Sequence, residues 1–205
     1  MNLIQLGANV GNDHVQKFIE GFRFNKIILV EPITKCHPIL KENYKDISNV
    51  YIESSVIISD PNALPGKVDF YFIDYPEYNI GGTNFEVSSL YEDITRDRGV
   101  NWDGLGRKIE LDSLNFESLL TKHNISKVDF LFIDIEGEDE KVLNNLDLFK
   151  YDFKIVMWER NDDDSTSLLK QKFFKLDYKI DQMHNNAVAY KEEYENHIQN
   201  IRQWV

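Results

Sequence analysis

The chain has 205 residues, of which 42% are hydrophobic and 28% charged, a balance that predicts a single globular domain over residues 1–205. Its one cysteine, Cys36, excludes an internal disulfide and favours a reducing, cytoplasmic setting. The formal net charge of −12 argues against nucleic acid as a partner. The sequence has no apolar run near the roughly 18 residues of a membrane span, and no secretory signal at its N-terminus.

The first part of the chain alternates apolar runs with amphipathic patterns. Apolar, β-branched runs predict strands, and apolar positions spaced three and four apart predict helices. The predicted order is strand 3–6, helix 14–22, strand 26–32, helix 37–45, strand 50–58 and strand 67–74. The turn signal DPN closes the strand at 50–58.

The second part of the chain begins with an irregular insert. Residues 75–107 contain five glycines and lack clear periodicity, as is usual for a loop of functional use. Regular patterns then predict helix 115–124, strand 127–134, a helix from residue 138, strand 153–159, helix 167–175 and a hairpin with arms 178–182 and 185–191. This alternation predicts an α/β fold with an open, mostly parallel sheet, helices on both faces and a C-terminal antiparallel hairpin.

Residues 192–205 predict a terminal helix. Its apolar stripe consists of Tyr194, Ile198, Ile201 and Val205, spaced four, three and four apart. Docking of this stripe on the body of the same chain is the simplest interpretation. A homodimer contact through the helix is the alternative.

The turn after the first predicted strand contains Gly7 and Gly11, spaced G-x-x-x-G. Glycines there let the backbone turn tightly and approach a ligand closely. Glu31 ends the second predicted strand, where an acid can accept both hydroxyls of a ribose. The absence of a middle glycine argues against a pyrophosphate, so the pattern favours an adenosine cofactor without one, such as S-adenosylmethionine. An ordinary strand-to-helix turn remains the alternative.

The sequence contains an eight-residue echo. KVDFYFID at residues 67–74 and KVDFLFID at residues 127–134 match at seven of eight positions. Their flanks differ, because an irregular loop follows Asp74 whereas a tight turn into a helix follows Asp134. We interpret the echo as two buried strands under similar constraints, not as a duplicated site.

The second copy runs into D-I-E-G, which holds two carboxylates, Asp134 and Glu136, around one turn. Two acids so close tend to raise the pKa of one of them, which suits a general base. The alternative is that one of these acids caps the following helix.

The segments LGANVG, VEP, LDSL, VDFLFIDIEGEDEKVL and MWE, in this order and spacing, resemble the FkbM-type methyltransferases. The resemblance covers residues 3–191, and its most specific part is DIEGEDEKVL, which is similar to the family's D-V-E-G-A-E-x-x-V-L. It implies a class I, Rossmann-like fold. It also implies an enzyme that takes a methyl group from S-adenosylmethionine, leaves S-adenosylhomocysteine, and methylates a hydroxyl of a sugar, glycan or small natural product.

The resemblance also implies roles for residues. The methionine end of the cofactor would be lined by Gly7, Ala8, Asn9 and Gly11. Glu31 would hold the ribose, and the adenine would lie beside Pro32, Ile33, Ser54, Ser55 and Val56. The methyl group and the acceptor would face Asp134 and Glu136, and the family's serine-bearing loop aligns with Asn84, Ser88 and Ser89.

The chain departs from the family pattern at two positions. Gln5 stands where the family has an acid before the first glycine, which removes one negative charge that would face the sulfonium. Phe132 stands where the family has a lysine, which affects the acceptor and the rate of turnover more than cofactor binding.

Methyl transfer to an alcohol needs a positioned base, for which Asp134 is the first candidate, with Glu136 or His184 behind it. His184 lies between the two hairpin arms, where a surface or capping role is the alternative. With a first strand that starts near residue 3, we expect the insert, and not an N-terminal lid, to build the acceptor pocket. Its aromatic and arginine side chains suit a sugar or an anionic group: Tyr75, Tyr78, Tyr91, Arg96, Arg98 and Trp102.

Two competing functions remain open from sequence. One is an NAD-linked oxidoreductase on the same architecture, and the other is an inactive cofactor-binding module that works through partners. The five histidines are scattered without ligand spacing, so we predict no metal site.

Overall fold

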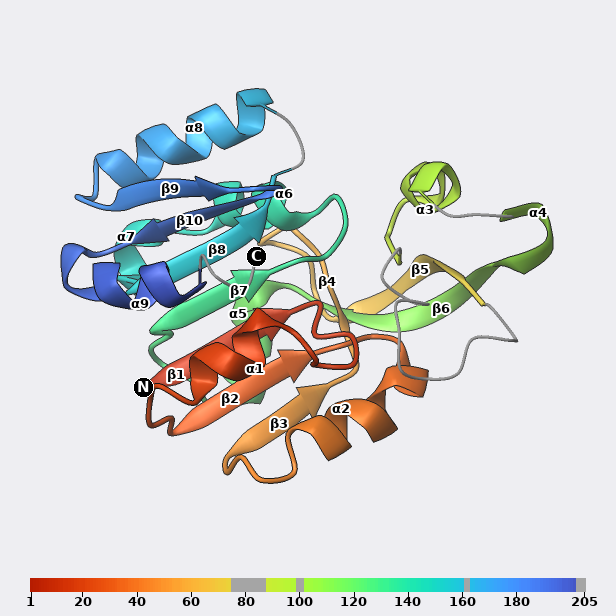
Figure 1. Cartoon of the computed structure of the whole chain (residues 1–205). Coiled ribbons are helices and arrows are strands. Elements are labelled where there is room, and N and C mark those ends of the chain that lie inside the picture. Colours follow the sequence, from red (N-terminus) through yellow and green to blue (C-terminus); the bar gives the residue numbers. More distant parts are fainter. Residues whose placement is uncertain (75–87, 99–101, 161–162, 202–205) are drawn as a thin grey trace.

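The computed structural model describes residues 1–74, 88–98, 102–160 and 163–201. Its central sheet has seven strands in the order β3-β2-β1-β7-β8-β10-β9 (Figure 1). They are β1 (Asn2–Leu6), β2 (Lys26–Val30), β3 (Val50–Glu53), β7 (Phe130–Ile133), β8 (Ile155–Glu159), β9 (Lys179–Met183) and β10 (Asn186–Tyr190). The first five are parallel, and β10 pairs antiparallel with both β8 and β9. The predicted fold class is confirmed.

Helices cover both faces of this sheet. One face packs against α1 (His14–Ile19), α2 (His37–Asn43) and α9 (Glu195–Ile201). The other packs against α5 (Phe116–Lys122), α6 (Asp139–Asn145), α7 (Leu148–Tyr151) and α8 (Asp163–Phe174). Alternate residues of β1 point to opposite faces, so Leu3 belongs to one core cluster while Ile4 and Leu6 belong to the other.

Two short 3₁₀ turns, η1 (Thr34–Cys36) and η2 (Glu192–Tyr194), lead into α2 and into the terminal helix α9. Ile198 of α9 is 1% exposed and packs in the same core cluster as α1, with Tyr194 partly buried beside it. The stripe therefore docks on its own chain at Tyr194 and Ile198. The side chain of Ile201 and residues 202–205 lie outside the described part of the chain, and a homodimer contact stays a prediction.

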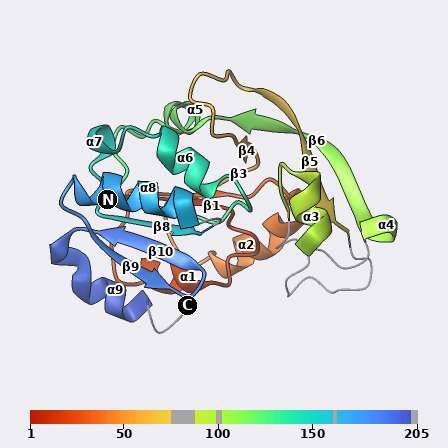
Figure 2. The same cartoon turned by 90° about the horizontal axis from the view of Figure 1, so that it is seen from above.

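A second, three-stranded sheet lies to one side of the first (Figures 1 and 2). It consists of β4 (Val56–Ile57), β5 (Gly66–Ile73) and β6 (Gly106–Leu114), in the order β4-β6-β5. Two short helices, α3 (Glu92–Arg98) and α4 (Trp102–Leu105), belong to the same region. β5 and β6 form a long antiparallel ribbon, with cross-strand ion pairs Lys67–Asp112 and Lys108–Asp69.

Three sequence predictions need correction here. The predicted single strand 50–58 is divided between the two sheets, as β3 and β4. Residues 67–74 form a strand, but it lies outside the central sheet. The predicted irregular insert gives way to strand at Gly106, and β6 was not predicted at all. The ribbon is half exposed, and its alternation of charged and apolar residues, as in Lys108 to Asp112, fits such a strand.

The two copies of the echo occupy non-equivalent places. In the second copy, every residue of β7 is buried between two layers of helices. In the first copy, β5 keeps one face exposed, so the prediction of two buried strands is wrong for this copy. The equivalent aspartates differ as well: Asp129 is buried with Lys154 at 2.9 Å, whereas Asp69 pairs with Lys108 at the surface. Similar letters serve two different strand environments.

Among the described residues, no helix has the length and apolar character needed to cross a membrane.

Candidate active site

A cavity of about 320 Å³ opens at the carboxyl ends of β1, β2 and β7. The sheet order reverses between β1 and β7, which is where open parallel sheets bind ligands. The predicted site residues that line it are Gly7, Ala8, Asn9, Gly11, Glu31, Pro32, Ser55, Val56, Ser88, Asp134 and Glu136. Residues not predicted also contribute: Val10, Asn12, Asp13, Val30, Ile57, Phe70, Leu90, Ile135 and Glu159.

The remaining predicted residues do not line the cavity. Ile33 is buried in the core cluster of the second sheet, and Ser54 is exposed between β3 and β4. Ser89 is fully buried, and its hydroxyl donates to the Glu136 carbonyl at 2.7 Å. His184 is exposed in the β9–β10 turn, which reaches the same edge of the sheet because Asn186 pairs with Glu159. Asn84 lies outside the described residues.

The insert's aromatic and arginine residues have different outcomes. Tyr91 packs against Lys141 and Glu138, and Arg96 pairs with Glu92 at 2.5 Å on its own helix. Tyr75 and Tyr78 lie outside the described residues, and so do the side chains of Arg98 and Trp102.

The glycine turn is built by backbone contacts. The N–H groups of Gly7 and Ala8 both donate to the Val30 carbonyl, at 3.0 and 2.9 Å. Gly7 has φ +80°, and a Cβ added there would lie 1.7 Å from the Asp134 carbonyl oxygen. Only glycine allows both the left-handed backbone and this contact. The turn of the first strand therefore rests directly on the strand end that carries Asp134.

Glu31 is held from one side by the backbone. Its two carboxylate oxygens accept from the N–H groups of Asn9 at 2.8 Å and Ile33 at 2.7 Å. The side chain is 6% exposed. Burial raises the pKa of Glu31 to about 7, although the two backbone hydrogen bonds act to lower it. A carboxylate in this position can accept further hydrogen bonds from the hydroxyls of a ligand.

The two departures from the family pattern lie on the face of the sheet covered by α1. Gln5 is buried, and its Nε2 donates to Asp13 Oδ2 at 2.6 Å. Asp13 also caps α1 and lines the cavity. Phe132 is paired with Gln5 across the strands, and its ring lies 5.1 Å from that of Phe18. Phe132 is thus a core residue, and Gln5 acts through Asp13.

Three carboxylates meet at the other part of the cavity. Oxygens of Asp134, Glu136 and Glu159 all lie within 4.8 Å of one another. Glu159 was not among the predicted site residues, although it ends a buried strand at the ligand edge, and that signal was available in MWE. Carboxylates grouped in this way can bind a divalent cation such as Mg²⁺. The sequence prediction of no metal site rested on the scattered histidines and did not consider these three acids.

The turn that carries these acids is shaped by Asp139. Its two carboxylate oxygens accept from the N–H groups of Ile135 and Gly137, at 3.2 and 3.3 Å. α6 begins after Glu138, which makes no side-chain capping bond. Stabilisation of the turn by Asp139 leaves Asp134 and Glu136 on the cavity wall.

A parallel sheet with this strand order and a final antiparallel hairpin, and a ligand cavity at its switch point, is the arrangement of class I methyltransferases. Residues 5–199 match the model of one such family, described as the methyltransferase FkbM domain. The chain belongs to this family, and it is an S-adenosylmethionine-dependent methyltransferase by that membership. The resemblance noted in the sequence is confirmed.

Comparison with solved structures gives distant likenesses. A precorrin-6y C5,15-methyltransferase from Geobacter metallireducens is 10% identical, with a TM-score of 0.45 over 94% of this chain and 80% of that one. A human methyltransferase 10 domain containing protein is 9% identical, with a TM-score of 0.43 over 93% of this chain and 71% of that one. A comparison with curated protein sequences found no match.

Proposed function

We propose that this protein transfers a methyl group from S-adenosylmethionine to a hydroxyl oxygen of a sugar, a glycan or a small natural product. One observation carries the proposal. A single cavity joins the buried carboxylate of Glu31, after β2, to the three carboxylates after β7 and β8, with the glycine turn of β1 between them. This order along the sheet edge suits a ligand with a ribose at one end and a cation at the other.

In this arrangement Glu31 accepts the ribose hydroxyls, and the glycine turn supports the methionine end through its backbone. Val56, Ile57 and Phe70 supply apolar surface for the adenine, and Ser55 lies next to them. The carboxylates after β7 and β8 attract the positively charged sulfonium, an interaction that is stronger in a partly desolvated cavity than in water. The same carboxylates are positioned to face an acceptor hydroxyl.

The chemistry requires alignment and one proton acceptor. The hydroxyl oxygen attacks the methyl carbon, the carbon–sulfur bond breaks, and S-adenosylhomocysteine leaves as a neutral thioether. Holding the partners in line can supply about 7–11 kcal/mol in good cases. The hydroxyl proton passes to Asp134, the base we propose, and such a base contributes roughly 10²–10⁴-fold. Glu136 orients the acceptor beside it.

The competing interpretations now have different standing. Membership of a methyltransferase family decides against the NAD-linked oxidoreductase. A cofactor-binding module without turnover differs from the proposed enzyme only in its rate, so turnover is the property to measure.

The test is calorimetric titration with S-adenosylmethionine, S-adenosylhomocysteine and NAD, followed by assays of labelled methyl transfer to a panel of methyl pyranosides. We expect micromolar binding of the two adenosyl ligands, none of NAD, and label in at least one pyranoside. Binding without label in any hydroxylated acceptor would contradict methylation of a sugar. Absence of adenosyl binding would overturn the placement of the cofactor.

A further inference from the structure

The turn that carries Glu136 has an unusual backbone. Glu136 has φ +49° and the next residue, Gly137, has φ +102°. A residue other than glycine with a left-handed backbone costs roughly 1–2 kcal/mol, and this conformation persists when neighbouring contacts hold it. The contacts that hold Glu136 therefore also set the direction in which its carboxylate enters the cavity.

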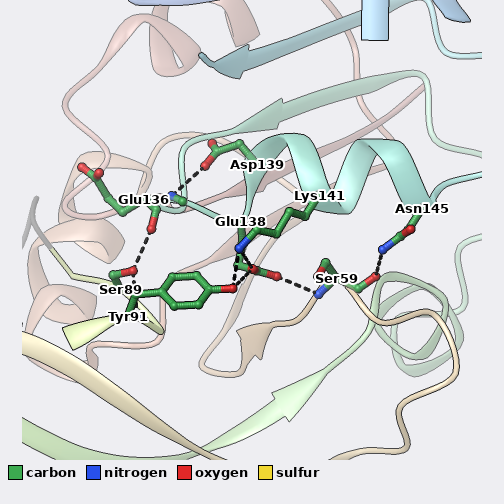
Figure 3. Close-up of polar contacts among 9 residues, drawn as sticks. Ser59, Ser89, Tyr91, Glu136, Glu138, Asp139, Lys141 and Asn145 are labelled. Atoms are coloured by element: carbon green, nitrogen blue, oxygen red, sulfur yellow. Dashed lines mark hydrogen bonds and ion pairs between the residues drawn. The ribbon is translucent and has the colours of Figure 1, made fainter. Parts of the chain in front are cut away.

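The first such contact comes from Ser89, 47 residues earlier in the chain. Its hydroxyl donates to the Glu136 carbonyl at 2.7 Å and accepts the N–H of Tyr91 at 3.1 Å (Figure 3). Ser89 is itself fixed, because its backbone exchanges two hydrogen bonds of 2.9 Å with Tyr71 of β5. The second sheet is thereby connected to the active-site turn through one buried hydroxyl.

The helix α3 lies directly on Gly137. A Cβ added to Gly137 would meet Ile94 Cδ1 at 2.4 Å and the Tyr91 ring at 3.5 Å. The segment from Ser89 to Ile94 therefore contacts the turn by hydrogen bonding and by close packing.

A second polar contact lies one residue further along the turn. The Tyr91 hydroxyl donates to Glu138 Oε1, and Lys141 Nζ lies 3.0 Å from the same oxygen and 4.1 Å from the centre of the Tyr91 ring (Figure 3). Glu138 Oε2 accepts the N–H of Ser59 at 3.1 Å. Glu138 is 3% exposed. Burial acts to raise the pKa of Glu138, but the bonds from Tyr91, Ser59 and Lys141 outweigh it and keep the pKa below its usual value.

We propose that Ser89 and Tyr91 are positioning residues that orient the Glu136 carboxylate towards the acceptor. The inference rests on the proposed function for its consequence in catalysis, but not for its geometry. Ser89 fixes the carbonyl of Glu136, and Tyr91 fixes the neighbouring Glu138. Neither residue is placed to touch the cofactor, because neither lines the cavity.

The chain contains a matched control for Tyr91. Tyr151 donates its hydroxyl to Glu117 Oε1, Lys150 Nζ lies 2.5 Å from the same oxygen, and this ammonium lies 5.2 Å from the Tyr151 ring centre. This second Tyr–Glu–Lys group joins α7 to α5, and none of its members lines the cavity. Tyr151→Phe thus removes the same kind of hydrogen bond away from the site.

The experiment compares wild type with Ser89→Ala, Tyr91→Phe and Tyr151→Phe. The first readout is amide hydrogen exchange of residues 135–140, which needs no acceptor. We expect about tenfold faster exchange there in Ser89→Ala and Tyr91→Phe, and no change there in Tyr151→Phe. The affinity for S-adenosylhomocysteine, which lacks the sulfonium charge that Glu136 would attract, should stay within twofold in all three variants, which shows that the rest of the cofactor site is intact.

The second readout is methyl transfer to whichever pyranoside the wild type methylates. Ser89→Ala and Tyr91→Phe should lower kcat/KM for that acceptor by about tenfold, and Tyr151→Phe should leave it within twofold. Unchanged exchange in both site variants would overturn the inference, and so would an equal loss of turnover in Tyr151→Phe. If wild type methylates no pyranoside, the acceptor class fails, while the exchange data still decide whether Ser89 and Tyr91 hold the turn.

Discussion

Two buried glutamates at neighbouring strand ends, Glu31 after β2 and Glu53 at the end of β3, are partnered in opposite ways. They are neighbours in the sheet, since the Glu31 N–H donates to the Glu53 carbonyl at 2.9 Å. The hydrogen bonds to the Glu31 carboxylate come from two backbone N–H groups. The Glu53 carboxylate instead meets Lys122 at 2.9 Å, His123 at 3.0 Å and the hydroxyl of Ser55 at 2.7 Å.

The pKa values follow these partners. Burial raises the pKa of Glu31 to about 7. Burial also acts to raise the pKa of Glu53, but the hydrogen bonds from Lys122, Ser55 and His123 outweigh it and bring the pKa to about 2. The Glu53 charge is neutralised by partners within the chain, so it contributes to the stability of the fold. A buried carboxylate on a cavity wall whose partners, within the described ranges of the chain, are backbone N–H groups is available to a ligand.

The largest expected effect concerns Glu31 and its proposed role in binding the cofactor. Glu31→Ala should weaken the binding of S-adenosylmethionine by about 10²–10⁴-fold, because two hydrogen bonds to a charged group, each worth about 1.5–3 kcal/mol, are lost. Calorimetric titration measures the change. Glu53→Ala is the matched control and should bind within about threefold of wild type. Equal losses in both variants would remove the distinction between the two acids.

The free energy of unfolding should depend more on Glu53 than on Glu31, the reverse of cofactor affinity. Glu53→Gln should lower the free energy of unfolding by about 2 kcal/mol at pH 7, because Lys122 and His123 lose their buried anionic partner, while the half-exposed Lys122 keeps the loss below that of a fully buried pair. Glu31→Gln should be neutral or stabilising. Urea denaturation followed by circular dichroism measures both, and a greater loss in Glu31→Gln would contradict the assignment.

The two acids also predict opposite pH dependences. The folded pKa of Glu31 lies above its unfolded value, so its contribution to stability is present below about pH 4.5 and is lost as the pH rises through about 7. If the ionised form binds the ribose, the cofactor should bind about tenfold more tightly at pH 8 than at pH 6. Titrations at both values check this, with Glu31→Gln as the variant in which the difference disappears.

Glu53 titrates in the other direction. Its folded pKa lies below its unfolded value, so its contribution is present above about pH 4.5 and is lost as the pH falls towards about 2.

The smallest expected effect concerns Ser55, which touches both regions. Its hydroxyl and N–H both donate to the Glu53 carboxylate, and Ser55 also lines the cavity. Ser55→Ala should cost about 1 kcal/mol of stability and change cofactor affinity by less than threefold. Thermal denaturation and titration of one preparation give both values. A loss of binding free energy larger than the loss in the free energy of unfolding would make Ser55 a direct ligand contact.

Sequence patterns predicted the parts of this molecule that depend on neighbours along the chain. Gly7, Gly11 and Glu31 follow apolar runs at the places where strands end, so their position on the ligand edge could be predicted from strand order alone. The segment D-I-E-G placed Asp134 and Glu136 on the cavity wall for the same reason. Glu159 had the same signal and was missed because only the family segment MWE, and not its last residue, was considered.

Partners distant in the chain could not be predicted. The run from Val50 to Ile58 was predicted as one strand, and it changes sheet where Val56 and Ile57 pair with Ser113 and Leu114 of β6. The pairing of Glu53 with His123 spans 70 residues. Ser89 was expected at the substrate, but its hydroxyl donates to the Glu136 carbonyl. This role depends on the antiparallel bridge between Ser89 and Tyr71 of β5, which the sequence pattern does not indicate.

The contact between Gly7 and the Asp134 carbonyl has a consequence for the history of this chain. Both Gly7 and Gly11 have a left-handed backbone, but at Gly11, with φ +70°, an added methyl group would meet only the side chains of Leu40 and Tyr44, and a second substitution could relieve that contact. At Gly7 it would meet a main-chain oxygen, which no exchange of side chains can move. A lineage that lost Gly7 could therefore regain the contact only by moving the backbone of one of the two strand ends, a larger change than shortening a side chain.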